Sequence, residues 1–460
     1  MSNFHITETK SHMRRIYLLA LLLDLLALAA NQLAARSSAF ANAYSHYVYR
    51  VLSLGIGSVT GLLPFSVVEL LLYATILFVL FDFVKQLRRA IHAGVECLRP
   101  ASAAQPRAGG VSQTFPPQAD ASRPAQLLAV ARPLRRFLSH LFLILSALLV
   151  LYVFLCGINY HRTSFSQEAG LSVTLDEHGT VYDEADLIAL CDYLVTEINA
   201  TEAQLAASAT LNANADVLRA PTSADATAEA SGTSGADEAP ATTIEVDGAC
   251  IGQTTETPKA SAAWLWHAGR TGQRAMEKLG QRYRRLSGHY PFPKPILNTW
   301  LLSVQQTTGV YSPFTVEANY NRDIAYYDIP FTICHELSHL RGYMQEEEAN
   351  FIGVLATIGA DDLYFNYSGY VSAWVYAGNA LARVDSTAFA TLYGRINART
   401  RQDMLYNNAY WKQFEGKPAE AHEQLNDAYL KMQGQATGVC SYGHVTDLML
   451  EYFVKNGTLK

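Results

Sequence analysis

The sequence predicts a membrane α-helical N-terminal part with three transmembrane helices, followed by a mainly α, α+β domain. Three observations support this fold class. Long apolar stretches recur in the first 160 residues, only 17% of the 460 residues are charged, and a helical His-Glu-x-x-His pattern lies far downstream. Soluble domains usually carry about 25% charged residues. Part of the chain is therefore expected to lie in lipid.

The three apolar stretches predict membrane helices at about 16–34, 66–84 and 137–158. The last has no charged residue and is long enough to cross a bilayer. The first contains Asp24, either a functional acid within the membrane or, as we favour, a residue packed against a neighbouring helix. A basic run before this first stretch leaves a cleaved signal peptide as the alternative.

The charge of the loop between the second and third stretches sets the predicted topology. This loop, residues 85–136, contains nine basic residues: Lys85, Arg88, Arg89, Arg99, Arg107, Arg123, Arg132, Arg135 and Arg136. By the positive-inside rule the loop is cytoplasmic. Residues 1–160 are then the membrane region, and residues 161–460 form a domain on the outer side.

Net charge and cysteine content exclude several classes of protein. The formal net charge is −6 with no long basic run, so nucleic acid is not expected as a partner. Six cysteines in 460 residues are too few for a disulfide framework. Cys191, Cys250, Cys334 and Cys440 of the outer domain could pair. We interpret Cys334, which is next to His335, as a small core residue rather than a third metal ligand.

Two segments are expected to be disordered because they are poor in large apolar residues. Residues 101–126 are rich in Pro, Ala, Ser and Gln, and residues 201–260 contain no aromatic residue. Such segments bury too little surface to offset their ordering entropy. We interpret 201–260 as an insertion within the outer domain.

Helices are predicted around these segments. Residues 41–61 predict a helix on the outer membrane face, and 184–199 have apolar residues at helical spacing. A helix at 262–286 carries a basic face that includes Arg282, Arg284 and Arg285. That face is either solvated, which we favour, or in contact with lipid headgroups.

The motif His335-Glu336-Leu337-Ser338-His339 is the strongest chemical signal. On a helix both histidines lie on one face, one turn apart, where they can bind one zinc ion. The surroundings favour a helix, with Asp328 as its N-cap, a proline in its first turn and an apolar stripe. Gly342 is expected to stop the helix.

The third metal ligand is predicted from the acidic run that follows. Gln345 stands where the metzincin pattern has a third histidine, so the chain is not a metzincin. Residues 346–350 instead match the E-x-x-A-N/D pattern of gluzincin-like peptidases. We therefore predict Glu346 as the ligand, with Glu348 as the alternative, and Asn350 as a supporting residue outside the ligand shell.

This pattern predicts a Zn²⁺-dependent hydrolase of zincin-like fold. Zinc acidifies a bound water, and Glu336 is placed to take its proton as general base. An oxyanion donor is also expected, for which Tyr367, His289 and His444 are candidates. Residues 313–321 are expected to supply an edge strand beside the cleft, with Glu317 and Asn319 as binding residues or as parts of a polar loop.

Several short motifs resemble an uncharacterised family of bacterial membrane proteins that have three membrane helices and an outer gluzincin-like domain. The motifs are Pro64-Phe65-Ser66 with Glu69, Gly157-Ile158-Asn159-Tyr160, Pro313–Asn319, the HELSHLRGYMQEEEANF core, Tyr367–Tyr370 and Asn426–Lys431. The resemblance covers most of the chain except 201–260. It implies a multi-pass protein of the bacterial cytoplasmic membrane with an extracytoplasmic zinc peptidase domain, and it names no substrate.

Two functions therefore compete. The first is a membrane-anchored zinc metallopeptidase whose partners are the lipid bilayer and a peptide or protein substrate. The alternative is a non-catalytic sensor or scaffold whose outer domain binds a ligand. The intact Glu336 favours the enzyme, because a retired site does not need its base.

Overall fold

The computed structural model describes residues 2–98, 122–171, 183–211, 260–432 and 444–460. Two compact units divide the chain. The apolar unit comprises Met1–Ala29 and Glu69–Val153, and the large unit comprises Ala30–Val68 and Phe154–Lys460. Of the segments predicted to be disordered, 101–121 and 212–259 fall outside the described residues, whereas 122–126 are helical, at the start of the long helix that begins at Ser122.

Three long helices make up the apolar unit: α1 (Ser2–Arg36), α4 (Val67–Leu98) and α5 (Ser122–Leu155). Their stretches Arg14–Arg36, Val67–Val95 and Val130–His161 are long and apolar enough to cross a membrane. Each of the three predicted membrane helices matches one of these stretches. The apolar unit is thus consistent with a membrane-anchored protein.

Polar contacts inside the apolar unit join α5 to the other two helices. The Ser146 hydroxyl donates to Asp24 over 2.8 Å, and His140 Nδ1 lies 2.8 Å from Asp82. Asp24 is buried against the neighbouring helix, as the packing interpretation predicted. Many leucines of these helices are exposed, for example Leu77 at 67%, which suits a lipid environment.

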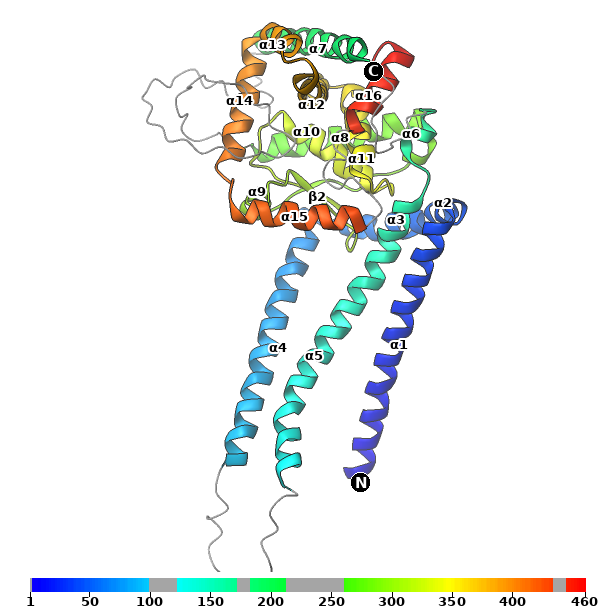
Figure 1. The fold of residues 1–460 in the computed structure, drawn as a ribbon, viewed down its shortest axis with the longest axis vertical. Helices are drawn as coiled ribbons and strands as arrows, with labels where there is room; N and C mark the ends of the chain where they lie inside the picture. Colours follow the sequence, from blue (N-terminus) through cyan, green and yellow to red (C-terminus); the bar gives the residue numbers. More distant parts are fainter. Residues whose placement is uncertain (1, 99–121, 172–182, 212–259, 433–443) are drawn as a thin grey trace, which may run out of the picture. The chain divides into compact units, whose positions relative to one another are not determined.

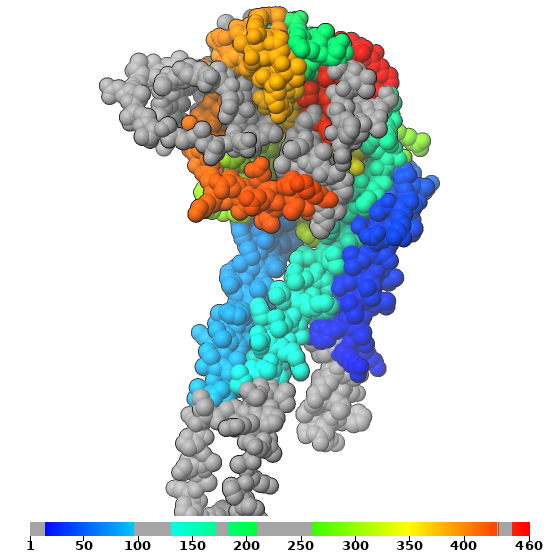
Figure 2. Space-filling view, viewed as in Figure 1, coloured from blue at the N-terminus to red at the C-terminus, as the bar shows by residue number. Residues whose placement is uncertain are grey.

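The large unit is mostly helical with one small sheet. Its elements are α2 (Ser38–Tyr44), the π-helix η1 (Ser45–Tyr49), α3 (Arg50–Thr60), the 3₁₀-helix η2 (Gly157–His161), α6 (Phe165–Glu168), α7 (Glu184–Leu211), α8 (Ala262–Arg282), the 3₁₀-helix η3 (Arg284–Leu286), β1 (Lys294–Pro295), α9 (Thr299–Ser303), β2 (Gly309–Ser312), β3 (Glu317–Tyr320), α10 (Asp328–His339), α11 (Glu346–Ile358), α12 (Leu363–Val384), α13 (Ser386–Arg395), α14 (Ala398–Lys412), α15 (Lys417–Met432) and α16 (His444–Asn456). Figure 2 shows α15, in orange-red, exposed on the near face of this unit.

The predicted helices are present with shifted ends. The helix expected at 41–61 is formed by α2, η1 and α3, and the helix expected at 262–286 ends at Arg282 before the turn η3. The helix expected at 184–199 continues to Leu211. The first eleven residues of the predicted insertion at 201–260 are therefore helical.

The sheet has the strand order β1-β3-β2. β1 pairs with β3 in parallel, with Lys294 opposite Asn319, and β2 pairs with β3 antiparallel, with Gly309 opposite Tyr320. The segment predicted as an edge strand, 313–321, therefore contains the central strand. Among the described residues, β2 is the edge strand on one side of the sheet.

Helix α10 lies at the centre of the large unit (Figure 1) and packs against α8, α11, α12, β2 and β3. Ile333 and Leu337, from the predicted apolar stripe, are completely buried. Asp328 is the first helical residue rather than the N-cap, which is Tyr327. Burial raises the pKa of Asp328 to about 7, because the low-dielectric surroundings penalise its charged form.

Candidate metal centre

The two histidines of α10 face each other at its C-terminal end. Their Nε2 atoms are 3.2 Å apart, as expected for side chains one helical turn apart. Gly353 of α11 allows this end of α10 to lie close to α11, because a Cβ on that residue would come within 3.1 Å of the Phe331 ring and 3.4 Å of the His335 amide. A small residue is therefore needed where the two helices meet.

A short turn returns the chain so that Glu346 meets these histidines. α10 ends at His339 and α11 begins at Glu346. Gly342, between them, has φ +81°, a left-handed conformation that glycine adopts without strain. Glu346 Oε2 lies 3.3 Å from His335 Nε2, and Oε1 lies 3.7 Å from His339 Nε2.

These three side chains form a group that could hold a metal ion. One donor atom from each lies within 4.8 Å of the others. Ligands bound at about 2.0–2.2 Å in a tetrahedral site are about 3.3–3.6 Å apart. The nitrogen–nitrogen and nitrogen–oxygen separations above are close to these values, so the donors fit one small ion with little rearrangement.

A hydrogen bond fixes the orientation and the tautomer of His339. Its Nδ1 lies 2.7 Å from the Tyr343 carbonyl oxygen, which can only accept, so Nδ1 carries the proton. Burial, together with the neighbouring His335, lowers the pKa of His339 to about 4, although Glu346 opposes this. The imidazole is therefore neutral near pH 7, with the Nε2 lone pair directed at the cluster.

His335 and Glu346 attract each other. Burial lowers the pKa of His335, but Glu346, Glu336 and Asn350 together outweigh it and the net shift is upward. Burial raises the pKa of Glu346, but the two imidazoles outweigh it and the net shift is downward. A carboxylate that stays ionised beside two imidazoles is the donor set that a divalent cation such as zinc prefers.

Asn350 lies one turn after Glu346 and is buried. Its side chain interacts with the His335 ring and raises the pKa of that histidine. His335 Nδ1 and Asn350 Nδ2 are nonetheless both buried without a hydrogen-bond partner in the described part of the chain. Asn350 thus lies where the sequence predicted it, beside a ligand candidate and outside the donor group.

Glu336 is buried where its own helix, α10, packs against the strand β2. Its Oε1 is 3.9 Å from His335 Nε2, and its Oε2 has no hydrogen-bond partner among the described residues. Burial raises its pKa to about 8, partly offset by His335 and by the Tyr311 backbone N–H. Gly309 of β2 leaves room for this carboxyl group, since a Cβ there would lie 2.6 Å from Oε1.

Glu348, the alternative ligand, points away from the cluster. Its oxygens accept hydrogen bonds from the Ser166 amide at 2.9 Å and the Ser166 hydroxyl at 2.7 Å, at the start of α6. Burial raises its pKa, while these hydrogen bonds oppose the rise. The structure therefore brings Glu346, and not Glu348, to the histidines.

Glu317 and Asn319, predicted as binding residues or a polar loop, have structural contacts. Glu317 is buried, forms an ion pair with Lys294, and accepts hydrogen bonds from the amides of Val67 and Val68. Asn319 donates to the carbonyl oxygens of Val310 and Glu317 at 3.3 Å. Both lie on the central strand β3 rather than at the edge.

The predicted oxyanion donors are not brought to the cluster by any contact in the described structure. The Tyr367 hydroxyl donates to Asp403 at 2.8 Å and to Thr400 at 3.1 Å. His289 is exposed, and His444 begins α16.

Sequence reasoning missed Tyr311, whose ring lies 5.9 Å from the His339 ring. In the sequence, Tyr311 is marked only by its position shortly before the predicted strand and the motif.

The free cysteines of the described chain are Cys156, Cys191 and Cys334, all buried. Cys334 is completely buried in the core, as predicted. Burial raises its pKa above the usual range of a thiol. Cys250 and Cys440, the other members of the predicted pairing set, lie outside the described residues.

Fold and site together define a protein with three apolar helices and a mostly helical domain that contains a His-His-Glu group. A family profile matches residues 125–450, and the chain therefore belongs to that family, described as a protein of unknown function (DUF3810). No curated protein and no solved structure gives a significant match. The sequence motifs resembled an uncharacterised family, and the matched family is also one of unknown function.

Proposed function

We propose that this protein is a membrane-anchored, zinc-dependent metallopeptidase of gluzincin-like, zincin-like type. The observation that carries the proposal is the convergence of His335, His339 and Glu346 within 4.8 Å, beside the buried carboxyl of Glu336. Three protein donors with an open position are typical of catalytic zinc sites, whereas structural sites use four. A zinc ion held by these donors would acidify a bound water and polarise a substrate carbonyl.

Glu336 is the proposed general base. Its Oε2 is free of hydrogen bonds in the described structure, so this oxygen is available to accept a proton from a water held beside it. The Tyr311 backbone N–H and the close contact with Gly309 hold this carboxyl in place. The Tyr343 carbonyl oxygen orients the His339 imidazole through Nδ1, and the Asn350 side chain interacts with the His335 ring.

The strand β2 supports a peptide as the substrate. It is an edge strand of the sheet, and its residues 309 and 311 contact the proposed base. An extended peptide can add to such an edge through main-chain hydrogen bonds, which places a scissile bond beside the strand. The same arrangement of edge strand, histidine helix and glutamate helix supports the zincin-like fold.

The proposed location is the cytoplasmic membrane of a bacterium, with the large unit on the outer side. The nine basic residues of the loop at 85–136 support this orientation. Reporter domains fused after residue 98 and after residue 460 are expected to lie on opposite sides. Reporter activity in the same compartment at both positions would contradict the topology.

Metal analysis of the full-length protein in detergent tests the site. We expect about one zinc per chain, lost in His335→Ala and kept in His267→Ala, a control whose histidine pairs with Asp362 instead. Cleavage of a peptide mixture, followed by mass spectrometry, should stop with a chelator and resume with added zinc. A chain that holds zinc but cleaves no peptide favours the non-catalytic sensor.

A further inference from the structure

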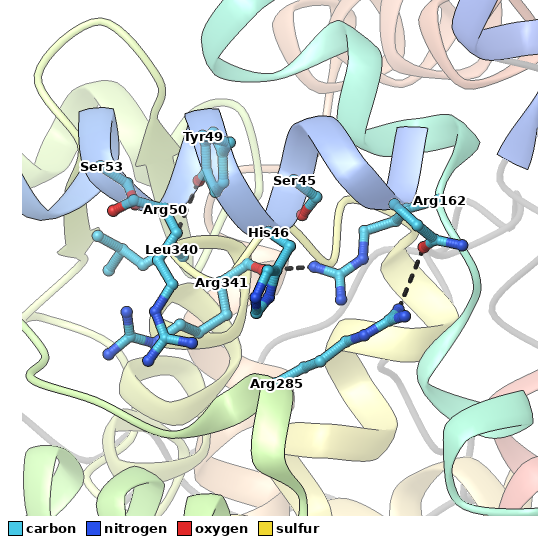
Figure 3. Close-up of a pocket in the computed structure, with 10 residues that line it drawn as sticks. Ser45, His46, Tyr49, Arg50, Ser53, Arg162, Arg285, Leu340 and Arg341 are labelled. Atoms are coloured by element: carbon cyan, nitrogen blue, oxygen red, sulfur yellow. Dashed lines mark hydrogen bonds between the residues drawn. The ribbon is translucent and has the colours of Figure 1, made fainter. Parts of the chain in front are cut away.

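A second polar site lies within the large unit, beside the turn that follows α10. Figure 3 shows this pocket, and its lining residues come from α2, η1, α3, η3, the residue that follows η2 and the start of that turn. Four of the lining residues are arginines, and none is acidic. The lining residues are Asn42, Ser45, His46, Tyr49, Arg50, Ser53, Arg162, Arg285, Leu340 and Arg341.

Two of the four guanidinium groups are buried. Arg162 is 6% exposed and Arg341 8% exposed, and the Nε atom of each has no hydrogen-bond partner in the described structure. Each guanidinium also lies over an aromatic ring, Arg162 at 4.2 Å from the Tyr343 centroid and Arg341 at 4.1 Å from that of Tyr290. These contacts fix the positions of both charged groups.

The negative charge close to these arginines is too small to balance them. Glu168 accepts from Arg162 at 3.3 Å and from Arg285 at 2.5 Å, and it also accepts from a tyrosine hydroxyl. Arg50 and Arg341 donate to the backbone carbonyls of Ser287 and His289. Among the described residues, Glu168 is the acid within ion-pair distance of the four, so three positive charges remain uncompensated.

Uncompensated buried charge is unfavourable unless a counter-ion is bound. Guanidinium groups from several directions suit an anion with several oxygens, since each can donate two parallel hydrogen bonds to it. The hydroxyls of Ser45 and Ser53 and the amide of Asn42 line the same pocket. We propose that this pocket binds a phosphate group, carried either by a lipid headgroup or by a soluble phosphate compound.

The phosphate pocket is separate from the metal cluster but shares backbone with it. Tyr49, which lines the pocket, donates to the carbonyl oxygens of His339 and Leu340 at 3.3 Å. Arg341 follows the ligand candidate His339 by two residues. The proposal does not depend on the metallopeptidase function, because its evidence is charge and burial within the pocket.

Calorimetric titration of the full-length protein in neutral detergent with inorganic phosphate gives the first test. Arg285→Gln and Arg50→Gln should each weaken phosphate binding by about 10- to 100-fold, the worth of a charge-assisted hydrogen bond. Arg395→Gln is the matched control, because that arginine is also partly exposed and paired with one acid, Asp192. Glu346→Gln should leave phosphate binding unchanged, which separates this site from the metal cluster.

The second arm identifies the source of the phosphate. Phosphatidylglycerol that stays bound through delipidation is measured by mass spectrometry in the parent and in the same variants. Retention that falls in Arg285→Gln and Arg50→Gln identifies a lipid headgroup, and phosphate binding without such retention identifies a soluble compound. The proposal is overturned if the parent shows neither phosphate binding nor phosphatidylglycerol retention, or if Arg395→Gln loses as much binding as the pocket variants. Circular dichroism checks that each variant is folded.

Discussion

Buried glutamates serve two regions of the large unit in opposite ways. At the starts of α4 and α6, Glu317 and Glu348 have hydrogen-bond donors on both carboxylate oxygens. At the candidate metal centre, Glu336 keeps one buried oxygen without a partner. An unsatisfied buried polar group costs about 1–3 kcal/mol. Full pairing therefore suits a structural carboxylate, and the incomplete pairing of Glu336 is consistent with the catalytic role proposed for it.

Glu336→Gln should have the largest effect on activity. Glutamine keeps the shape of the side chain but cannot accept a proton, so peptide cleavage should fall by a factor of about 10² to 10⁴. Zinc content and thermal unfolding should stay near the parent values, because the three donors are intact. Parent-level cleavage by this variant would remove the enzyme interpretation.

Glu317→Ala should instead act on stability. It leaves the Lys294 ammonium buried without its carboxylate, and breaking a buried ion pair in this way costs about 3–5 kcal/mol. Thermal unfolding in detergent measures the loss, with the exposed Glu415 mutated to alanine as control. Unchanged unfolding in Glu317→Ala would show that full pairing is a poor sign of a structural role.

The neighbouring Glu346 and Glu348 give the closest test within one helix. Glu346→Gln should weaken zinc binding by more than the 10- to 100-fold typical of losing a residue outside the ligand shell. Glu348→Gln should leave zinc affinity within about threefold and lower stability through its lost contacts with Ser166, by about 1–3 kcal/mol. Zinc titration against a competing chelator measures both. The opposite ranking would assign the third ligand to Glu348.

Asn350→Ala should affect zinc binding less than Glu346→Gln does. It removes the side chain that contacts His335 but no donor, so zinc affinity or cleavage rate should fall by about 10- to 100-fold. Asn366→Ala in α12, whose amide bonds three backbone carbonyls, is a control for loss of a buried amide. It should lower stability without a specific loss of zinc.

The helix and its histidines could be predicted from sequence because the information is local. The spacing of His335 and His339 and the apolar stripe at Ile333 and Leu337 specify one face of one helix. The choice of Glu346 came from the pattern that ends at Asn350. It depends physically on the turn at Gly342, which sets where α11 begins.

The strand order and the phosphate pocket could not be predicted because their determinants are not local. β1 has only two residues, too few for a pattern, yet its pairing moves β3 from the edge to the centre of the sheet. The four arginines of the pocket lie between positions 50 and 341 and come together only in the fold. Arg285 belonged to a predicted basic face, but its partners Asn42 and Glu168 are distant in sequence.

The short turn between α10 and α11 also limits what a bound ion can do for folding. All three donors lie between residues 335 and 346, so an ion that joins them closes a loop of about ten residues. Loop-closure entropy grows with the logarithm of loop length, and a donor set spread over about sixty residues would restrain the unfolded chain by about 1–1.5 kcal/mol more. A bound ion would therefore restrain only the hairpin formed by α10 and α11, and the rest of the large unit would depend on its own hydrophobic core for stability.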